Sequence, residues 1–500
     1  MLSRLKPDIE IAIILLLLLS LPGCGFRPVD VDISLGEEKP ASSAEIGLMK
    51  SISPDNVGYM LYDLDGKTVV RSHNSSRAFI PASTTKVPVT VTALDVLGPD
   101  YRFNTFLCYT GSIKGGILKG DLYLKGTGDP LLTVTDLMSM IDRMKDKGIS
   151  AVSGHFYFDE SDLASAVSID SGMEPDVSFN PGVSALSLEY NTINAEWKRN
   201  KKTNAIDIFL VPSLPVNSTA LSREKLRENI KFAYHSLGGI ESWLLSPDED
   251  RDGSERLPVK QPARYTAQVF AKVCDIRGIS LPAPESGTMP RCVTSIIAHQ
   301  GQPLSGIADI ALTYSINLMA ELMMLRTAKE LSGKSTDMKS AAEKISSYLS
   351  EKLDKINWKY LRLVNGSGLT AHNRITPEQM IAVLIYADAQ NYNGKKYRSL
   401  LPSSGWEWSL MKRFSDPETA FHIWAKTGTI NYAMALAGYL YTKSHRNMAF
   451  VVFIHDIEER RMHDAEPNRR IKESMKKVNA WLDNSKSVMD SIVTGWITEL

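Results

Sequence analysis

The sequence has little cysteine and no excess of charge. Four of its 500 residues are cysteine, and 57 basic side chains balance 57 acidic ones. This balance argues against nucleic acid as a partner. Cys108, Cys274 and Cys292 lie beyond the N-terminal region and have no histidine at ligand spacing, so no metal site is expected. One disulfide among these three would leave one thiol over. Cys274 and Cys292 are the nearer pair, but spacing alone does not establish a bond.

Sequence signatures of several common enzyme classes are also missing. No G-x-S-x-G elbow occurs, which disfavours a Ser–His–Asp hydrolase. The absence of H-E-x-x-H disfavours a zinc peptidase, and there is no P-loop for a nucleotide. The nine histidines are scattered along the chain. No metal or organic cofactor is therefore expected.

The apolar run near the N-terminus, residues 11–19, is too short to span a bilayer, which takes about 20 residues. It follows Arg4 and Lys6 and has the length of a signal-peptide core. The next residues, Leu21-Pro22-Gly23-Cys24, resemble the bacterial lipobox, whose cysteine is lipidated. We expect residues 1–24 to be a lipoprotein-type signal peptide, Cys24 to carry a lipid anchor and residues 25–43 to form a tether. An ordinary signal peptide with an incidental cysteine is the alternative.

The spacing of apolar residues predicts regular structure at both ends of the chain. Residues 57–63 and 67–71 flank Asp65-Gly66 and predict a β-hairpin. Helical spacing recurs over 83–97 and 307–331. Closer to the C-terminus, the pattern predicts a buried strand at 449–454 and an amphipathic helix at 469–482 that packs on a sheet.

Short β-like segments predominate between about residues 103 and 281. The chain therefore reads as an α/β (α+β) domain that is discontinuous in sequence. Residues 44–102 form its first part, residues 291–500 its second part, and residues 103–290 a large β-rich insertion. A chain of this length is expected to have more than one domain.

Ser83-Thr84-Thr85-Lys86 places a hydroxyl and an amine at close spacing. A serine hydroxyl is a weak nucleophile and needs a base within hydrogen-bond reach. If Ser83 opens a helix, Lys86 lies one turn later on the same face, and the helix N-terminus favours developing negative charge. Roughly two chance matches to S-x-x-K are expected in a chain of this size. Others begin at Ser3, Ser222 and Ser474. A plain N-cap role for Ser83 therefore stays open.

Lys426-Thr427-Gly428-Thr429 occurs once, at the start of an apolar, strand-like stretch. K-T-G is expected by chance in about one such chain in ten. Lys426 offers a fixed cation, the threonine hydroxyls can donate to a carboxylate, and Gly428 lets a ligand backbone approach closely. The alternative is an edge strand with a solvated lysine.

Ser315-Ile316-Asn317 lies between these two motifs and leads into a strongly apolar helix. S-x-N also begins at Ser72 and Ser178. Taken alone, the segment is best interpreted as a helix N-terminus.

In this order, S-x-x-K, S-x-N and K-T-G resemble the signature of the penicillin-recognising serine enzymes. The 232 residues from Ser83 to Ser315 exceed what class A β-lactamases leave between those motifs. A long insertion at this point resembles the class C low-molecular-mass penicillin-binding proteins, the D-alanyl-D-alanine carboxypeptidase/endopeptidase family. Further stretches that agree with this family are Gly120-Asp121-Leu122-Tyr123-Leu124, Gly126-Thr127-Gly128-Asp129-Pro130, Ser184-Ala185-Leu186-Ser187, Asn365-Gly366-Ser367-Gly368-Leu369 and Ala437-Gly438-Tyr439-Leu440.

Three residues depart from the expected pattern. Asn365 stands where the family usually has Asp. Ala371 falls where many members carry an Arg that reads a diaminopimelate carboxylate, so that specificity is in question. Pro88 removes the backbone hydrogen bond to the Thr84 carbonyl and predicts a local kink.

The resemblance implies an acyl-enzyme mechanism on peptidoglycan stem peptides. Ser83 would attack the carbonyl of the penultimate D-Ala while Lys86 takes its proton. Lys86 must be neutral for this, and burial beside Lys426 is an environment that lowers its pKa. Ser315 would relay a proton to the leaving amine, and Asn317 would orient Lys86.

The same resemblance assigns the substrate-binding residues. Lys426, Thr427 and Thr429 would hold the terminal carboxylate beside Gly428, and the N–H groups of Ser83 and Thr429 would form the oxyanion hole. β-Lactams would leave a long-lived ester on Ser83.

Two alternatives remain at this point: a β-lactamase or esterase on the same fold, and a non-catalytic peptidoglycan-binding envelope lipoprotein. The expected location is periplasmic, with a lipid anchor in the bacterial envelope, and Gly25 after the lipobox favours the outer membrane by analogy. The motifs leave open the balance of carboxypeptidase and endopeptidase activity, the third residue of the stem peptide and the oligomeric state.

Overall fold

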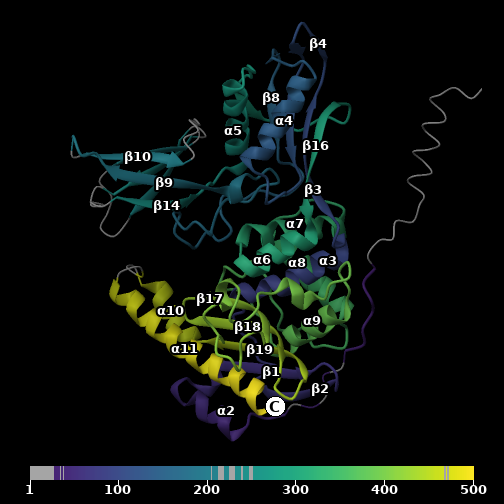
Figure 1. The fold of residues 1–500 in the computed structure, drawn as a ribbon, viewed down its shortest axis with the longest axis vertical. Coiled ribbons are helices and arrows are strands. Elements are labelled where there is room, and N and C mark those ends of the chain that lie inside the picture. The colour runs from purple at the N-terminus through teal and green to yellow at the C-terminus, as the bar shows by residue number, and fades with distance from the viewer. Residues whose placement is uncertain are drawn as a thin grey trace, which may run out of the picture.

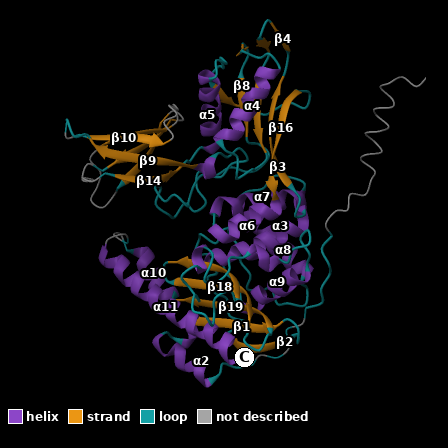
Figure 2. Ribbon diagram, in the orientation of Figure 1, coloured by secondary structure: helices purple, strands orange, loops and turns teal. Residues whose placement is uncertain are grey.

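The computed structural model describes residues 27–500 except 34, 36, 38, 204, 212–218, 224–230, 238–239, 247–251, 467–468 and 470–471. One half of the molecule, here called the core domain, is built on a five-stranded antiparallel sheet in the order β17-β18-β19-β1-β2 (Figures 1 and 2). Its strands are β1 (Val57–Asp63), β2 (Thr68–His73), β17 (Ile423–Ile430), β18 (Ala433–Tyr441) and β19 (Asn447–His455). Because β1 pairs with β19, segments from the two ends of the chain share one sheet.

Both faces of this sheet are covered by helices. In β19, Val451 and Phe453 belong to one hydrophobic cluster, whereas Phe450 and Val452 belong to another on the opposite face. Successive side chains of a strand point to opposite faces, so burial on both faces explains the uninterrupted apolar run at residues 449–454. One face packs on α9 (Pro377–Ala389), in a cluster that also contains residues of α3 (Lys86–Leu97), α6 (Leu304–Tyr314), α7 (Asn317–Ser332) and α8 (Met338–Lys352). The other face packs on α11 (Lys472–Glu499), which in turn contacts α2 (Ser43–Leu48).

A second body, the inserted module, lies between α3 and α6 in the chain and stacks above the core domain (Figure 1). Its main sheet has the order β15-β8-β6-β3-β16. These strands are β3 (Arg102–Tyr109), β6 (Leu122–Gly126), β8 (Phe156–Asp159), β15 (Pro284–Ser286) and β16 (Thr294–Pro303). Smaller sheets are formed by β4 (Ser112–Lys114), β5 (Ile117–Lys119) and β7 (Ala151–Val152), by β9 (Thr192–Arg199), β10 (Ile206–Val211) and β14 (Gly253–Pro258), and by β11 (Thr219–Arg223), β12 (Phe232–Leu237) and β13 (Ile240–Leu245).

The module also contains two helices that the sequence interpretation did not include, α4 (Val134–Asp146) and α5 (Pro262–Ile276). Leu137 of α4 and Phe270 of α5 are buried in the same cluster as the main sheet. β16 pairs with β3, although residues 291–500 were assigned to the second part of the core domain. We therefore propose that the module ends near Pro303 rather than at residue 290.

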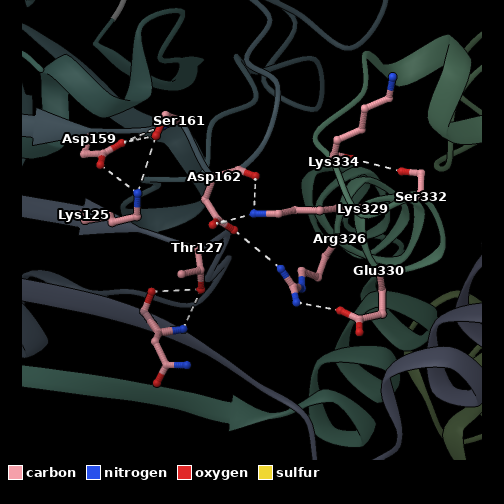
Figure 3. A network of polar contacts seen from close by, with 11 residues as sticks. Lys125, Thr127, Asp159, Ser161, Asp162, Arg326, Lys329, Glu330, Ser332 and Lys334 are labelled. Atoms are coloured by element: carbon pink, nitrogen blue, oxygen red, sulfur yellow. Dashed lines mark hydrogen bonds and ion pairs between the residues drawn. The ribbon is translucent and has the colours of Figure 1, made fainter. Parts of the chain in front are cut away.

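A polar network joins the inserted module to α7 (Figure 3). Lys329 of α7 donates to the carboxylate of Asp162 at 2.6 Å and to its backbone carbonyl at 3.0 Å. Arg326, one turn earlier, lies 3.7 Å from the same carboxylate. The α7 helix, which begins at Asn317, is thus tied to the module.

The segment predicted to be a tether, residues 25–43, packs against the core domain in those of its residues that the structure describes. Ile33 and Leu35 are buried in its hydrophobic cluster, and Val29 exchanges backbone–side-chain hydrogen bonds with Gln390. Cys24 and the predicted signal peptide, residues 1–24, lie outside the described residues. No helix in the described part of the chain is both long and apolar enough to cross a membrane.

Two further expectations are settled by the structure. The helical stretch over 307–331 is two helices, because the backbone turns left-handed at Ser315 (φ 59°) and ends α6 there. The three cysteines beyond the N-terminal region are all free thiols, with Cys108 and Cys274 buried and Cys292 exposed.

Candidate active site

The nucleophile candidate lies in a tight turn rather than in the α-helix itself. Residues Ala82–Thr85 form a 3-10 turn, and α3 begins at Lys86. Pro88 therefore falls in the first turn of α3, where N–H groups have no intrahelical partner and proline costs little. The Lys86 N–H donates to the carbonyls of Ser83 and Thr84, so the Thr84 carbonyl keeps a partner without a bond from residue 88.

Lys86 is fully buried and contacts three groups. Its Nζ lies 3.1 Å from Ser83 Oγ, 2.7 Å from Asn317 Oδ1 and 2.9 Å from the Ser367 carbonyl oxygen. The structure thus brings S-x-x-K and S-x-N together, although 231 residues separate Lys86 from Asn317.

Burial, followed by the nearby Lys426 cation, holds the pKa of Lys86 well below its ordinary value, while the Glu321 carboxylate acts in the opposite direction. Burial also lowers the pKa of Lys426, to about 7. Both changes follow from the cost of a charge in a site that excludes water. A neutral amine at Lys86 is what general-base chemistry near neutral pH requires.

The S-x-N segment forms the break between α6 and α7. Ser315 caps α6 in a left-handed conformation, and Asn317 is the first residue of α7. The Asn317 amide is held at both ends: its oxygen accepts from Lys86, and its nitrogen donates to the Phe179 carbonyl at 2.9 Å. Phe179 belongs to the inserted module, which therefore reaches the site directly.

The K-T-G segment lies on β17, the edge strand of the sheet. Lys426 is buried, and its Nζ donates to the Thr427 carbonyl at 2.9 Å. Thr427 donates from Oγ1 to Ser409 Oγ at 3.0 Å. A Cβ at Gly428 would lie 2.8 Å from the Pro81 oxygen and 2.9 Å from the Ser83 nitrogen. Gly428 therefore lets the strand approach the nucleophile turn, whereas the sequence interpretation assigned it to a ligand backbone.

The sequence interpretation did not include Glu321 or the loop after α8 in the site. Glu321 is completely buried one turn after Asn317 and accepts the N–H groups of Gly366 and Ser367, each at 2.9 Å. These bonds position the Ser367 carbonyl that contacts Lys86. The i, i+4 spacing of Asn317 and Glu321 in an apolar helix was the available signal.

Asn365, the first departure from the pattern, helps to shape this loop. Its Oδ1 accepts from the Gly368 N–H at 3.1 Å and from Asn373 Nδ2 at 3.1 Å. The neutral amide thus supplies the acceptor that the turn needs.

A cavity of about 650 Å³ opens in front of Ser83. Ser315, Asn317 and Thr429 line it, as do Ala371 and the module's Asp170 and Phe179. Arg469 lines one side of the cavity, where it forms an ion pair with Glu174 at 3.1 Å. Ser83 and the strand edge at Thr429 line the same cavity, and the buried Lys86 contacts Ser83, an arrangement that acyl transfer requires.

Solved structures share this architecture. Penicillin binding protein 4 (dacB) from Haemophilus influenzae superposes with a TM-score of 0.75 at 21% identity, covering 91% of this chain and 100% of that one. The same protein in complex with a β-lactam gives a TM-score of 0.73. A predatory endopeptidase from Bdellovibrio bacteriovorus gives 0.52 at 17% identity, over 88% of this chain and 93% of that one.

These likenesses show that the chain has the fold of penicillin binding protein 4. The model of the D-Ala-D-Ala carboxypeptidase 3 (S13) family matches residues 44–481, and the chain belongs to that family. Two curated relatives agree. D-alanyl-D-alanine carboxypeptidase DacB of Haemophilus influenzae is 25% identical over 419 residues, 80% of this chain and 85% of the relative. D-alanyl-D-alanine carboxypeptidase of an Actinomadura species is 22% identical over 413 residues, 77% of this chain and 74% of the relative.

The family confirms the class C resemblance and the expected fold class. The protein is a serine-type D-Ala-D-Ala carboxypeptidase, a hydrolase that acts on peptidoglycan. The remaining questions concern its residues: which groups perform the reaction, and what surrounds the bond that is cut.

Proposed function

We propose that Ser83 is the nucleophile and Lys86 its general base in the hydrolysis of D-Ala-D-Ala peptides. The observation that carries this assignment is the set of three contacts at Lys86 Nζ. A neutral amine has two N–H donors and one lone pair. Asn317 Oδ1 and the Ser367 carbonyl can only accept, so they take both donors. The lone pair is then left facing Ser83 Oγ, ready to take its proton.

In the reaction that follows, Ser83 Oγ bonds to the carbonyl carbon of the penultimate D-Ala as its proton passes to Lys86. The N–H groups of Ser83 and Thr429 stabilise the oxyanion, at about 3–4 kcal/mol for one such donor. Ser315 relays a proton to the leaving nitrogen as the amide C–N bond breaks. Water then hydrolyses the ester and regenerates the Ser83 hydroxyl.

Lys426, Thr427 and Thr429 bind the carboxylate of the leaving D-Ala. The Thr427–Ser409 hydrogen bond sets the threonine hydroxyl, and Lys426 Nζ donates to the Thr427 carbonyl at 2.9 Å. A β-lactam presents a carboxylate at the same position, so it acylates Ser83 and blocks the site as a long-lived ester.

The test is labelling with a fluorescent penicillin, wild type beside Ser83→Ala, followed by intact mass after a chase. Ser222→Ala is the matched control, because Ser222 opens another S-x-x-K match in an exposed strand of the inserted module. We expect a stable adduct in the wild type and in the control only, and D-Ala release from a pentapeptide that follows the same pattern. Rapid turnover of the drug would instead indicate a β-lactamase, and labelling of Ser83→Ala would overturn the assignment.

We also propose that the mature protein begins at a lipidated Cys24 and is held in the bacterial envelope, in the outer membrane. The support is the lipobox-like Leu21 to Cys24. Metabolic labelling with a radioactive fatty acid should mark the wild type and not Cys24→Ser. Equal labelling of the two, or release of the wild type as a free periplasmic protein, would contradict the anchor.

A further inference from the structure

A second cavity, of about 670 Å³, adjoins the catalytic one. We call it the aromatic cleft. Phe179, Tyr190 and Arg256 of the inserted module and Tyr314 and Trp408 of the core domain form its walls. Its volume lies within the roughly 300–1,000 Å³ typical of ligand sites. Phe179, Tyr314, Ser315 and Asn317 line both cavities, so the cleft begins at the S-x-N segment.

Large aromatic side chains face this cleft without being covered. Phe179 is 54% exposed, Tyr314 50% and Trp408 58%, and the rings of Tyr314 and Trp408 meet edge-to-face at 5.2 Å. Trp408 also holds a left-handed backbone (φ 35°), which is costly for a bulky residue and is typically retained at functional sites. Exposed aromatic rings grouped beside an active site are typical of a binding surface.

The position of the cleft relates it to the leaving group. It begins at Ser315, which gives a proton to the departing nitrogen in the mechanism above. Trp408 is the neighbour of Ser409, and Ser409 fixes Thr427, which binds the leaving carboxylate. In the mechanism above, the acyl half of the substrate lies in the catalytic cavity, because Ser83 and Ala371 line that cavity and not the cleft. The aromatic cleft therefore lies beyond the bond that is cut, on the amine side.

We propose that the aromatic cleft binds the amine-side peptide of two cross-linked stem peptides, the segment released when the enzyme acts as an endopeptidase. This inference rests on the proposed roles of Ser83, Ser315 and Thr427. A free D-Ala leaving group ends at Thr427 and leaves the cleft unused. A cross-linked leaving group continues past the broken C–N bond as a peptide with carboxylates of its own, and the exposed Arg256 offers them a cation.

The chemical step is the one already described. The Ser83 ester forms, the amide C–N bond of the cross-link breaks, and the relayed proton goes to the freed amine. The amine-side peptide then leaves through the cleft, and water enters to hydrolyse the ester. Phe179, whose carbonyl accepts from Asn317, lines both cavities.

The test compares two substrates in Trp408→Ala: a cross-linked muropeptide dimer, and a monomeric pentapeptide that can lose only D-Ala. We expect the ratio of kcat/KM for the dimer to kcat/KM for the pentapeptide to fall by about tenfold or more, the loss typical of removing an anchoring aromatic side chain. Trp406→Ala is the matched control, because Trp406 is 67% exposed, contacts the Phe421 ring in a tilted geometry and lines neither cavity. Its ratio should equal that of the wild type.

An unchanged ratio in Trp408→Ala, even with both activities reduced, would overturn the inference. So would a wild type that releases D-Ala from the pentapeptide and does not cleave the dimer, a result that leaves the proposed function standing. Absence of penicillin labelling at Ser83 would overturn both. Binding of a peptide-free amino-sugar oligomer, lost in Trp408→Ala, would reassign the cleft to glycan.

Discussion

At the scale of single residues, the catalytic assignment depends on a proton balance between two buried lysines. Lys86 is the proton acceptor only while it is neutral. Its pKa is lowered by burial first and by the charge of Lys426 second. Lys426 lies in an equally dry position, where burial brings its own pKa to about 7. Burial therefore favours the neutral amine at Lys86, and Lys426 titrates near neutral pH, so its charge, and with it the binding of a carboxylate, depends on pH.

The first prediction concerns the pH dependence of acylation. The active form has Lys86 deprotonated, so the rate of penicillin acylation should fall as pH falls through the lowered pKa of Lys86, and should level off well below pH 10.5. In Lys426→Gln the like charge is gone, the pKa of Lys86 rises, and the acid limb should move to higher pH. Stopped-flow acylation with a fluorescent penicillin measures both profiles. If the acid limb of Lys426→Gln lies at the same pH as that of the wild type, whatever the change in maximal rate, then Lys426 does not lower the pKa of Lys86.

The second prediction concerns Gly428. A methyl group there would meet the Pro81 oxygen and the Ser83 nitrogen inside 3.0 Å, so β17 must move away from the nucleophile turn in Gly428→Ala. Because Thr429 on this strand supplies one oxyanion donor, acylation should slow by about 100-fold or more. The variant should keep its circular dichroism spectrum. Wild-type acylation kinetics in Gly428→Ala would show that the close approach is not needed.

Local spacing made part of this site predictable and left part of it hidden. Ser83 and Lys86 are three residues apart, and the K-T-G motif is contiguous, so the order of these short motifs along the chain singled them out among the other matches. Glu321 and the Ser367 carbonyl act through contacts between α7 and a loop more than 40 residues further along the chain. No local sequence pattern predicts such contacts. A glutamate in an apolar helix was the one sequence feature that pointed to this part of the site.

At the scale of secondary-structure elements, the spacing of apolar residues predicted regular strands and helices. It did not predict the point where the backbone breaks a helix. The hairpin of β1 and β2 and the buried strand β19 were predicted, because alternation and burial determine them. The break between α6 and α7 was not, since apolar residues keep helical spacing across it. The left-handed backbone at Ser315 does not change the spacing of the apolar residues, so the sequence gives no sign of it. This break turns Ser315 toward the cavity.

The third prediction belongs to helix α3, which carries Lys86 at one end and Asp95 near the other. Burial raises the pKa of Asp95 to about 7, with Tyr386, Lys352 and Tyr348 opposing the shift. Between about pH 4 and pH 7 the folded state keeps a proton that the unfolded chain releases, so stability falls as pH rises through this window and stays reduced above it.

Asp95→Asn removes this penalty. Its free energy of unfolding should exceed that of the wild type by about 1–3 kcal/mol at pH 8, with the difference vanishing near pH 4. Urea denaturation at several pH values measures it. Asp100→Asn, at an exposed position just after the helix, is the control and should change the free energy of unfolding by less than about 0.5 kcal/mol. A difference for Asp95→Asn that does not vary with pH would contradict the raised pKa of Asp95.

At the scale of the whole molecule, the inserted module is part of the active site and not an appendage. Its Phe179 carbonyl accepts from Asn317 in the candidate site, and its Glu174 pairs with Arg469 at the edge of the same cavity. The module is anchored by Asp162 to α7, the helix that begins at Asn317 (Figure 3). One helix thus carries both the anchor of the module and the residue that orients Lys86, so the position of the module and the geometry of the base are linked.

The fourth prediction tests this anchor. Asp162→Ala leaves the partly buried Lys329 without its carboxylate, and the two bodies lose their strongest polar link at α7. We expect a loss of about 1–3 kcal/mol in the free energy of unfolding, as for other charged hydrogen bonds that lose one partner. Asp146→Ala is the control, because its pair with Arg143 is exposed on both sides and should contribute less than about 1 kcal/mol. Hydrogen exchange should also quicken in the first turns of α7 in Asp162→Ala. Equal effects of the two substitutions, or exchange in α7 as slow as in the wild type, would mean that Asp162 does not anchor the module to α7.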